Sequence, residues 1–399
     1  MEAFGSTNHS KAETLTKKVF KGGAWILGFK IIHQLFSFIR LVILARLLAP
    51  VDFGLVGIAL LVVAIFETFS QTGFGPALIQ TQKKIDEYID ISWSINILRG
   101  IILFIILYAS APLTANLFKS PEAVRIVQII GLSILLKAFV NIGVIYFLKD
   151  LEFNKQFLYD LSATLADFLV AVSAAVLLKS VWALVFGCLA GNITRLVVSY
   201  MIHPYRPRFT LDFKKARDLF HFGKWVWGST ILVFLITQGD DLFVGVVLGT
   251  AALGLYQVAY RISNLAATEI ANVIALVTFP AYSKLHSNIS KLKTAFLTTA
   301  HLTIFTSAPV AILIYSLSYE FTAIFLGEKW LPMIPAMQVL AIVGLLRSIA
   351  ATTSPVFWAA NHPDLDTKVK ITQLVLLVIL IYPLSTTWYL KGLSSAVLI

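Results

Sequence analysis

Four side chains in one apolar segment have the types and the spacing to hold an anion. Lys30, His33, Ser37 and Arg40 follow one another at intervals of three, four and three residues. On an α-helix these intervals place all four on one face, within about 80° of arc. Polar groups are costly inside a membrane helix and usually face a bundle interior or an aqueous cavity. Arg40 would lie about 12 Å from the end of that helix, which is deep for a side chain that only reaches back to the membrane surface.

Ionisable residues recur in other apolar segments of the chain. The residues that we predict to contact an anionic substrate are Lys30, His33, Arg40, Lys137, Arg261 and Arg347. The carboxylates that we predict to bind a coupling cation are Glu67, Asp240, Asp241 and Glu269. The alternative is that some of these residues only form ion pairs within the bundle, for example Arg40 with Asp240. A lone intramembrane histidine such as His33 is more often a hydrogen-bonded structural residue than a proton relay.

The elements that must position these residues are membrane helices. The chain has 399 residues, of which 58% are hydrophobic and 13% charged, and its mean hydropathy is +0.83. Soluble domains carry roughly 25% charged residues, so lipid must be the solvent here. The predicted spans are 22–48, 54–78, 89–110, 123–148, 157–178, 180–201, 220–248, 253–280, 296–325, 334–360 and 369–390. A twelfth span could begin at 392–399, so we expect 11 to 12 helices and a chain that lacks its last helices.

A stretch of the chain is duplicated without a gap. Ten positions between 20–59 are identical to those 200 residues later, among them Gly28 with Gly228 and Gly54 with Gly254. Six predicted helices lie between the two starts, so the repeats are parallel, as in a group of secondary transporters. We therefore predict an all-α polytopic membrane protein with two pseudo-symmetric six-helix lobes. The layout is a tail at 1–20, a lobe with helices 1–6 at 21–201, an inter-lobe loop at 202–219, and a second lobe at 220–399 with helices 7–11 and the start of a twelfth.

The basic residues indicate an orientation. Most Lys and Arg of the loops lie in the N-terminal tail and in the loops after predicted helices 2, 4, 6, 8 and 10. The positive-inside rule places that side, and with it the N-terminus, in the cytoplasm. The first twenty residues lack the pattern of a cleaved signal peptide. The net charge of +11 is thereby explained by topology, and nucleic-acid binding is not expected.

Enzymatic motifs are missing from the sequence. It contains no GxGxxG, Walker A, HExxH or CxxC motif and only one cysteine, Cys188. The predicted external loops are too short to form a catalytic domain. We expect no enzyme activity, no cofactor and no metal site.

Three segments carry a family resemblance. They are 44–54 (LARLLAPVDFG), 73–80 (GFGPALIQ), and Asp240-Asp241 followed by 253–261 (LGLYQVAYR). With these segments the chain resembles the bacterial polysaccharide exporters, the Wzx-type O-antigen, colanic-acid and teichuronic-acid flippases of the MATE-like superfamily. Members of that family usually have twelve to fourteen helices.

The resemblance implies a specific function. The substrate would be an undecaprenyl-diphosphate-linked oligosaccharide, moved across the bacterial inner membrane for lipopolysaccharide, capsule or exopolysaccharide synthesis. The two lobes would form a V and work by alternating access, with polysaccharide polymerase and co-polymerase proteins as partners. A cationic cavity suits a diphosphate, because Arg and Lys pair readily with phosphate oxygens. The alternatives are a cation-coupled drug or small-molecule antiporter of the same superfamily and a major-facilitator-type carrier.

Overall fold

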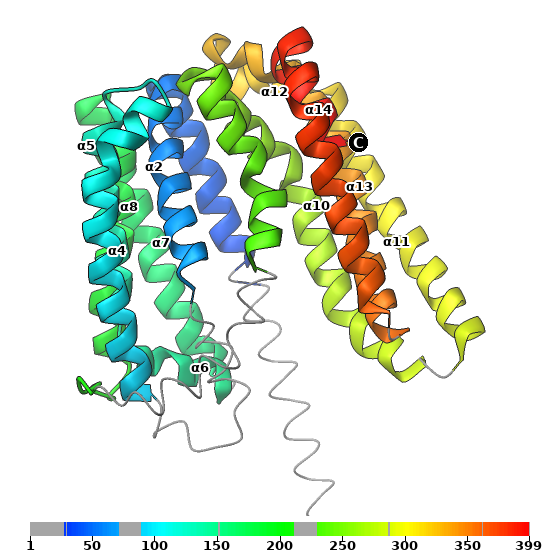
Figure 1. Cartoon of the computed structure of the whole chain (residues 1–399), viewed down its shortest axis with the longest axis horizontal. Helices are drawn as coiled ribbons and strands as arrows, with labels where there is room; N and C mark the ends of the chain where they lie inside the picture. Colours follow the sequence, from blue (N-terminus) through cyan, green and yellow to red (C-terminus); the bar gives the residue numbers. More distant parts are fainter. Residues whose placement is uncertain are drawn as a thin grey trace, which may run out of the picture. The chain divides into compact units, whose positions relative to one another are not determined.

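The computed structural model describes residue 28 and residues 30–71, 89–150, 152–210, 230–285, 288–360 and 362–398. Within these ranges every regular element is helical (Figure 1), and residues 30–47 also lie in a helix. The elements are α2 (Pro50–Phe69), α4 (Ile89–Leu117), α5 (Ala123–Ala138), η2 (Ile142–Val144), α6 (Ile145–Lys149), α7 (Phe153–Leu178), α8 (Trp182–Ile202), η3 (Val244–Leu248), α10 (Thr250–Leu285), α11 (Ile289–Ser316), α12 (Ser318–Phe321), η4 (Thr322–Leu326), η5 (Glu328–Met333), α13 (Ile334–Ala359) and α14 (Pro363–Leu398).

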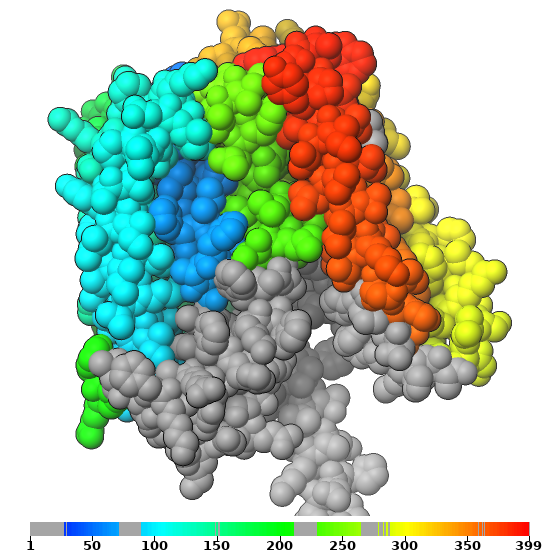
Figure 2. Space-filling model, in the orientation of Figure 1, coloured from blue at the N-terminus to red at the C-terminus, as the bar shows by residue number. Residues whose placement is uncertain are grey.

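The part of the chain that the structure describes contains eight helices long and apolar enough to cross a membrane. Their outer faces carry large apolar side chains. On α4 these include Ile101, Ile105 and Leu113, and on α14 they include Val378 and Ile379. Figure 2 shows both helices at the surface of their respective units, α4 in cyan and α14 in orange to red. Such faces are costly in water and suited to lipid, so the chain is a multi-pass membrane protein.

The chain divides into two compact units. Unit 1 comprises Met1–Leu48 and Ile58–Leu232, and unit 2 comprises Ala49–Gly57 and Val233–Ile399. In unit 1, α7 packs along α8, α4 packs along α5, and α5 also contacts α8. In unit 2, α10 and α11 pack along α13, which also contacts α14. The first turns of α2 belong to unit 2, although the rest of that helix belongs to unit 1.

A close helix crossing in unit 2 depends on two glycines. A Cβ added at Gly54 would collide with the carbonyl oxygen of Thr250. A Cβ added at Gly254 would collide with the carbonyl oxygen of Pro50. The two collisions therefore relate positions 50 and 54 to positions 250 and 254, an offset of 200. Small residues at membrane-helix contacts allow backbones to approach this closely.

The span predicted at 123–148 is wrong as a single helix. Helix α5 ends at Ala138, and Asn141 has an extended backbone with φ −62° and ψ 111°. The Asn141 side chain accepts a hydrogen bond from the Gly143 backbone N–H, which starts η2. The Trp93 indole N–H donates to the Val140 carbonyl at 3.1 Å. The helix can end inside the protein because other side chains satisfy the freed backbone groups.

Other predicted spans differ from the structure in their ends or in their continuity. Helix α2 covers Pro50–Phe69 where 54–78 was predicted, and residues 72–88 lie outside the described residues. The span predicted at 296–325 is divided among α11, α12 and η4. Helix α14 runs beyond the predicted 369–390 but contains a break at Trp388 and Tyr389, where Tyr389 has φ 51°.

The described beginning of the predicted inter-lobe loop, residues 203–210, packs on unit 1. The Asp90 carboxylate accepts from the Tyr205 hydroxyl at 2.6 Å and from the Arg208 backbone N–H at 2.8 Å. The Thr210 backbone N–H donates to the Ser94 hydroxyl at 2.8 Å. These bonds fix the segment to the first turns of α4.

Candidate functional site

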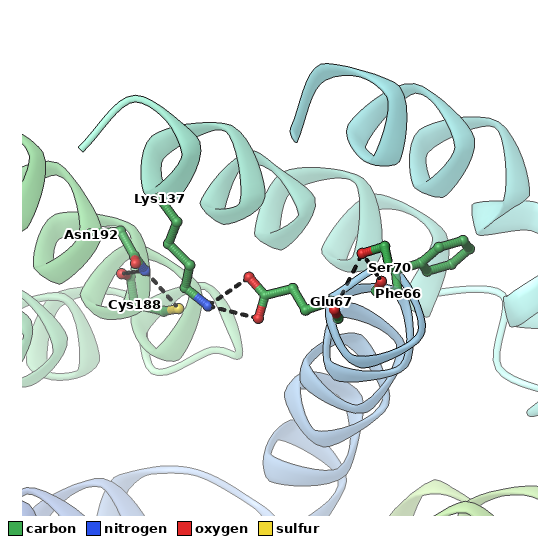
Figure 3. A network of polar contacts seen from close by, with 6 residues as sticks. All are labelled: Phe66, Glu67, Ser70, Lys137, Cys188 and Asn192. Atoms are coloured by element: carbon green, nitrogen blue, oxygen red, sulfur yellow. Dashed lines mark hydrogen bonds and ion pairs between the residues drawn. The ribbon is translucent and has the colours of Figure 1, made fainter. Parts of the chain in front are cut away.

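A partly exposed ion pair in unit 1 joins α5 to α2. Lys137 lies in the last turn of α5, and its ammonium donates to both carboxylate oxygens of Glu67 at 3.0 and 3.1 Å (Figure 3). The Lys137 side chain is 46% exposed and that of Glu67 is 29% exposed. The chain therefore leaves part of the surface of each group uncovered.

Side chains satisfy the backbone carbonyls at the end of α2, the helix that carries Glu67. The Ser70 hydroxyl donates to the carbonyl of Phe66 at 2.6 Å (Figure 3). The Arg99 guanidinium donates to the Ser70 carbonyl at 3.2 Å. A basic side chain at the C-terminal end of a helix satisfies carbonyls that lack a partner within the helix. Arg99 thus adds a second positive charge near Glu67.

A second ion pair in unit 1 joins Arg40 to Asp167 of α7 at 3.0 Å. The side chains are 18% and 27% exposed, so this pair is more enclosed than the first. Gly187 and Gly191 of α8 make the space for Asp167, because a Cβ at either glycine would lie within 3.2 Å of that side chain. Within unit 1 the carboxylate that pairs with Arg40 is therefore that of Asp167 on α7, whereas the sequence alternative had named Asp240.

Cys188 and Asn192 lie near both ion pairs. The Asn192 amide donates to the Cys188 carbonyl at 2.8 Å and contacts its sulfur at 3.7 Å, and Figure 3 shows both residues beside Lys137. The Cys188 thiol also lies within the electrostatic range of both ion pairs. The two pairs therefore form one cluster in unit 1, to which five helical segments contribute. We call it the polar interior of unit 1, and its members are Arg40, Glu67, Lys137, Asp167 and Cys188.

A third pair links α7 and α8 in unit 1. The Arg195 guanidinium contacts the Asp160 carboxylate at 3.3 Å, and the Gln156 amide donates to the same carboxylate at 2.6 Å. Neither Asp160 nor Asp167 was among the predicted site residues. Their interval of seven residues, which places both on one face of α7, is the signal that could have identified them.

In unit 2, Asp240 is buried with 2% exposure. The Tyr256 hydroxyl donates to its carboxylate at 2.7 Å, and the Asp241 backbone N–H donates to it at 3.0 Å. The Asp241 side chain in turn accepts a hydrogen bond from Gln257. Both acids predicted to bind a cation are thus held by side chains from the start of α10.

Arg347 of α13 is held by an aromatic side chain. Its guanidinium donates to the Tyr260 hydroxyl and lies 5.3 Å from the centre of the Tyr260 ring. The rings of Tyr256 and Tyr260 are 6.1 Å apart. Among the described residues Arg347 has no carboxylate partner, which distinguishes it from Arg40 and Lys137.

The other predicted residues are less informative. Lys30 is half-buried in unit 1, and His33 is exposed. Arg261 is exposed on α10. The side chain of Glu269 lies outside the described residues. Sequence reasoning also missed Tyr256 and Tyr260, whose interval of four residues in α10 places them on one face.

A histidine outside the spans has a perturbed environment. His203 follows α8, and its ring stacks on Tyr146 with centroids 5.5 Å apart and an interplanar angle of 6°. Burial lowers the pKa of the His203 imidazole, and the nearby Lys155 ammonium lowers the pKa further. Its Nδ1 atom accepts a hydrogen bond from the Tyr205 backbone N–H at 3.2 Å, which requires an unprotonated nitrogen.

The family described as "Polysaccharide biosynthesis protein" matches residues 43–335. The chain is similar to the teichuronic acid biosynthesis protein TuaB of Bacillus subtilis, with 26% identity over 88% of this chain and 73% of that protein. It is also similar to the lipopolysaccharide biosynthesis protein WzxC of Escherichia coli, with 25% identity over 92% of this chain and 75% of that protein.

Two solved structures have a similar fold. An inward-facing multidrug resistance MATE family transporter of the MOP superfamily gives a TM-score of 0.71 at 16% identity, over 92% of this chain and 90% of that one. The lipid II flippase MurJ in an inward closed conformation gives a TM-score of 0.71 at 16% identity, over 92% of this chain and 84% of that one. At such identities the likeness concerns the fold alone.

Proposed function

Because the chain belongs to the polysaccharide biosynthesis protein family, we propose that it is a flippase for surface polysaccharide synthesis. Its substrate is an undecaprenyl-diphosphate-linked oligosaccharide, which it moves across the bacterial inner membrane by alternating access. Lipopolysaccharide, capsule or exopolysaccharide is the end product. The names of TuaB and WzxC, which are teichuronic acid and lipopolysaccharide biosynthesis proteins, support this assignment.

The observation that carries the proposal is the polar interior of unit 1. Lys137 and Arg40 are cations in apolar helical segments, and each is only partly enclosed. Ionisable groups at membrane depth are costly and mark substrate or ion pathways. Arg and Lys are natural partners of phosphate oxygens, and arginine adds a bidentate geometry. A diphosphate is therefore the substrate group that these cations suit.

Each cation can have two arrangements, one paired with its carboxylate and one paired with the substrate. When a diphosphate binds Lys137 or Arg40, it takes the place of Glu67 or Asp167. The released carboxylate then needs a proton or a metal cation, because an unpaired charge at this depth is unfavourable. Glu67 thus remains a proposed ion-coupling residue, together with Asp240 and Asp241.

The finer architecture is part of the proposal. We propose two pseudo-symmetric six-helix lobes with 11 to 12 helices in this chain, divided at residues 202–219, and a cytoplasmic N-terminus. The crossing of α2 and α10 supports the duplication, because it brings positions 50 and 54 against positions 250 and 254. The positive-inside bias supports the orientation. Polymerase and co-polymerase proteins are proposed partners that receive the exported substrate.

A cation-coupled antiporter is the second candidate function. The observation that favours it is the buried Asp240 beside Asp241, since buried acids are suited to binding cations. Its substrates would be cationic or neutral small molecules. Such substrates have no need of Lys137 and Arg40, so the two functions predict different sensitive residues.

The test is export in a bacterial strain that lacks its own flippase of this family. The full chain should restore the surface polysaccharide of that strain. A strain that still lacks surface polysaccharide with the protein present in its membrane, but gains resistance to toxic cations, would favour the antiporter instead.

A further inference from the structure

Three cations in apolar helices differ in how their charge is balanced. Lys137 is paired with Glu67 and Arg40 with Asp167, both at 3.0 Å. Arg347 is held only by the ring and hydroxyl of Tyr260 among the described residues. A tyrosine hydroxyl is neutral, so it fixes the direction of the guanidinium without cancelling its charge. Arg347 therefore keeps its full positive charge and most of its five N–H donors.

An acid that could pair with Arg347 is held by another tyrosine. Asp240 lies within the electrostatic range of Arg347. Its carboxylate instead accepts the Tyr256 hydroxyl at 2.7 Å. Tyr256 and Tyr260 are one helical turn apart on α10, with their rings 6.1 Å apart. The Tyr256 hydroxyl thus donates to the Asp240 carboxylate, whereas the Tyr260 hydroxyl accepts from the Arg347 guanidinium.

The two halves of the chain differ at the positions that correspond to the partners of Lys137 and Arg347. Arg347 follows Lys137 by 210 residues, and both lie next to a leucine pair in their helices. The residue 200 positions after Glu67 is Ala267, so the second half has no acid there. The residue 200 positions before Tyr260 is Leu60, so the first half has no such tyrosine. As far as the structure describes the chain, each half therefore holds its cation with a different kind of partner.

We propose that Tyr260 and Tyr256 are positioning residues that keep Arg347 from pairing with Asp240, so that its guanidinium stays available to phosphate oxygens of the substrate. The inference rests on the proposed function for the identity of the ligand. Two residues would thus act through Arg347, and among the described residues Arg347 is a cation of unit 2 that a diphosphate can bind without displacing a carboxylate.

The test uses the full chain in detergent with two probes, inorganic pyrophosphate and farnesyl diphosphate. In Tyr260→Phe the ring stays and the hydroxyl is lost, so Arg347 is free to pair with Asp240. We expect the affinity for both probes to fall about tenfold, near the lower end of the effect of one hydrogen bond to a charged group. Adding Asp240→Asn to Tyr260→Phe should restore the affinity to within about threefold, because the competing charge is gone.

The matched control is Tyr200→Phe. Its hydroxyl donates to the Phe139 carbonyl at 3.0 Å in unit 1, so this variant also loses one tyrosine hydrogen bond but should bind both probes normally. Wild-type affinity in Tyr260→Phe, or no recovery in the double variant, would overturn the positioning role.

A second measurement separates this inference from the proposed function. An experimental structure of Tyr260→Phe without ligand should show the Arg347 guanidinium within ion-pair distance of Asp240. If the two groups stay apart, the inference is wrong whatever the probes do. If they pair but the wild-type protein binds neither diphosphate, the positioning role holds in the fold, whereas the diphosphate as ligand and the proposed function both fail.

Discussion

At the scale of single residues, the proposed transport depends on three cations that lie in apolar helices, two paired with carboxylates and one with a tyrosine. The cations Arg40, Lys137 and Arg347 were recognisable because a charge inside an apolar run is costly. Their partners were not, since Asp167 and Tyr260 lie far from them in sequence. Only the packing of separate helices decides which acid or hydroxyl meets which cation.

Lys137→Ala should abolish most export while the protein stays in the membrane. The Arg99 guanidinium lies near Glu67 and partly balances the charge of this carboxylate when Lys137 is lost, so the protein should still reach the membrane. Loss of the cation should lower export at least about tenfold, because each 1.4 kcal/mol of lost substrate binding is a factor of ten. Surface polysaccharide and membrane abundance are measured in the same cells.

The control for Lys137 is Lys155→Ala. Lys155 pairs with Glu152 at 2.8 Å and is 44% exposed, close to the value for Lys137, but it lies at the start of α7 outside the polar interior. Export should stay near the wild-type level. Equal losses in the two variants would show that any partly exposed ion pair matters and that Lys137 has no special role.

Arg40 permits a sharper distinction between substrate binding and scaffold. Arg40→Ala should abolish export, and Arg40→Lys should keep part of it, because lysine retains the charge but loses the bidentate geometry. The double change Arg40→Ala with Asp167→Ala removes the acid that would otherwise be left unpaired. This double variant should be as abundant in the membrane as the wild-type protein but should not export polysaccharide. Recovery of export in the double variant would make Arg40 a scaffold residue.

His203 should give the fold a pH dependence. The folded protein favours the neutral ring, so this contribution to stability is fully present above the ordinary histidine pKa of about 6.5. It is lost as the pH falls through the lowered pKa of the folded state. The melting temperature of the purified protein should therefore drop between pH 7.5 and pH 5, and His203→Gln should flatten that part of the profile. An unchanged slope in His203→Gln would assign the pH dependence to other groups.

At the scale of helices, hydropathy predicted where apolar segments lie but not where they break. The segment predicted at 123–148 ends as α5 at Ala138, because Asn141 and Trp93 satisfy backbone groups that a straight helix would have satisfied itself. A window average cannot detect such a break. The glycines at 54 and 254 were visible as repeated residues, but only the structure shows that each one faces a backbone carbonyl.

The α2–α10 crossing should tolerate no added side chain. Gly254→Ala places a Cβ against the Pro50 carbonyl and forces the helices apart, which typically costs about 1–3 kcal/mol. The melting temperature and membrane abundance should both fall. Gly239→Ala is the control, since nothing lies within 4 Å of the Cβ it adds, and helix propensity predicts no loss there. Similar behaviour of the two variants would contradict the close crossing.

At the scale of the whole molecule, composition and family resemblance predicted a polytopic helical carrier. The family match over residues 43–335 and the similar folds of a MATE transporter and a lipid II flippase agree with that class. The count of spans and the pseudo-symmetric lobes stay predictions. They depend on segments such as 72–88 and 211–229, which lie outside the described residues.

We propose that this protein carries a lipid-linked diphosphate across a bilayer through its membrane cations. The most direct measurement uses liposomes that contain the purified protein and a fluorescent polyprenyl-diphosphate oligosaccharide, with a quencher added outside. The wild-type protein should expose to the quencher the lipid that started in the inner leaflet, and Lys137→Ala and Arg40→Ala should each slow this at least about tenfold. Quenching that stops at the outer leaflet, as in liposomes without protein, would contradict the account.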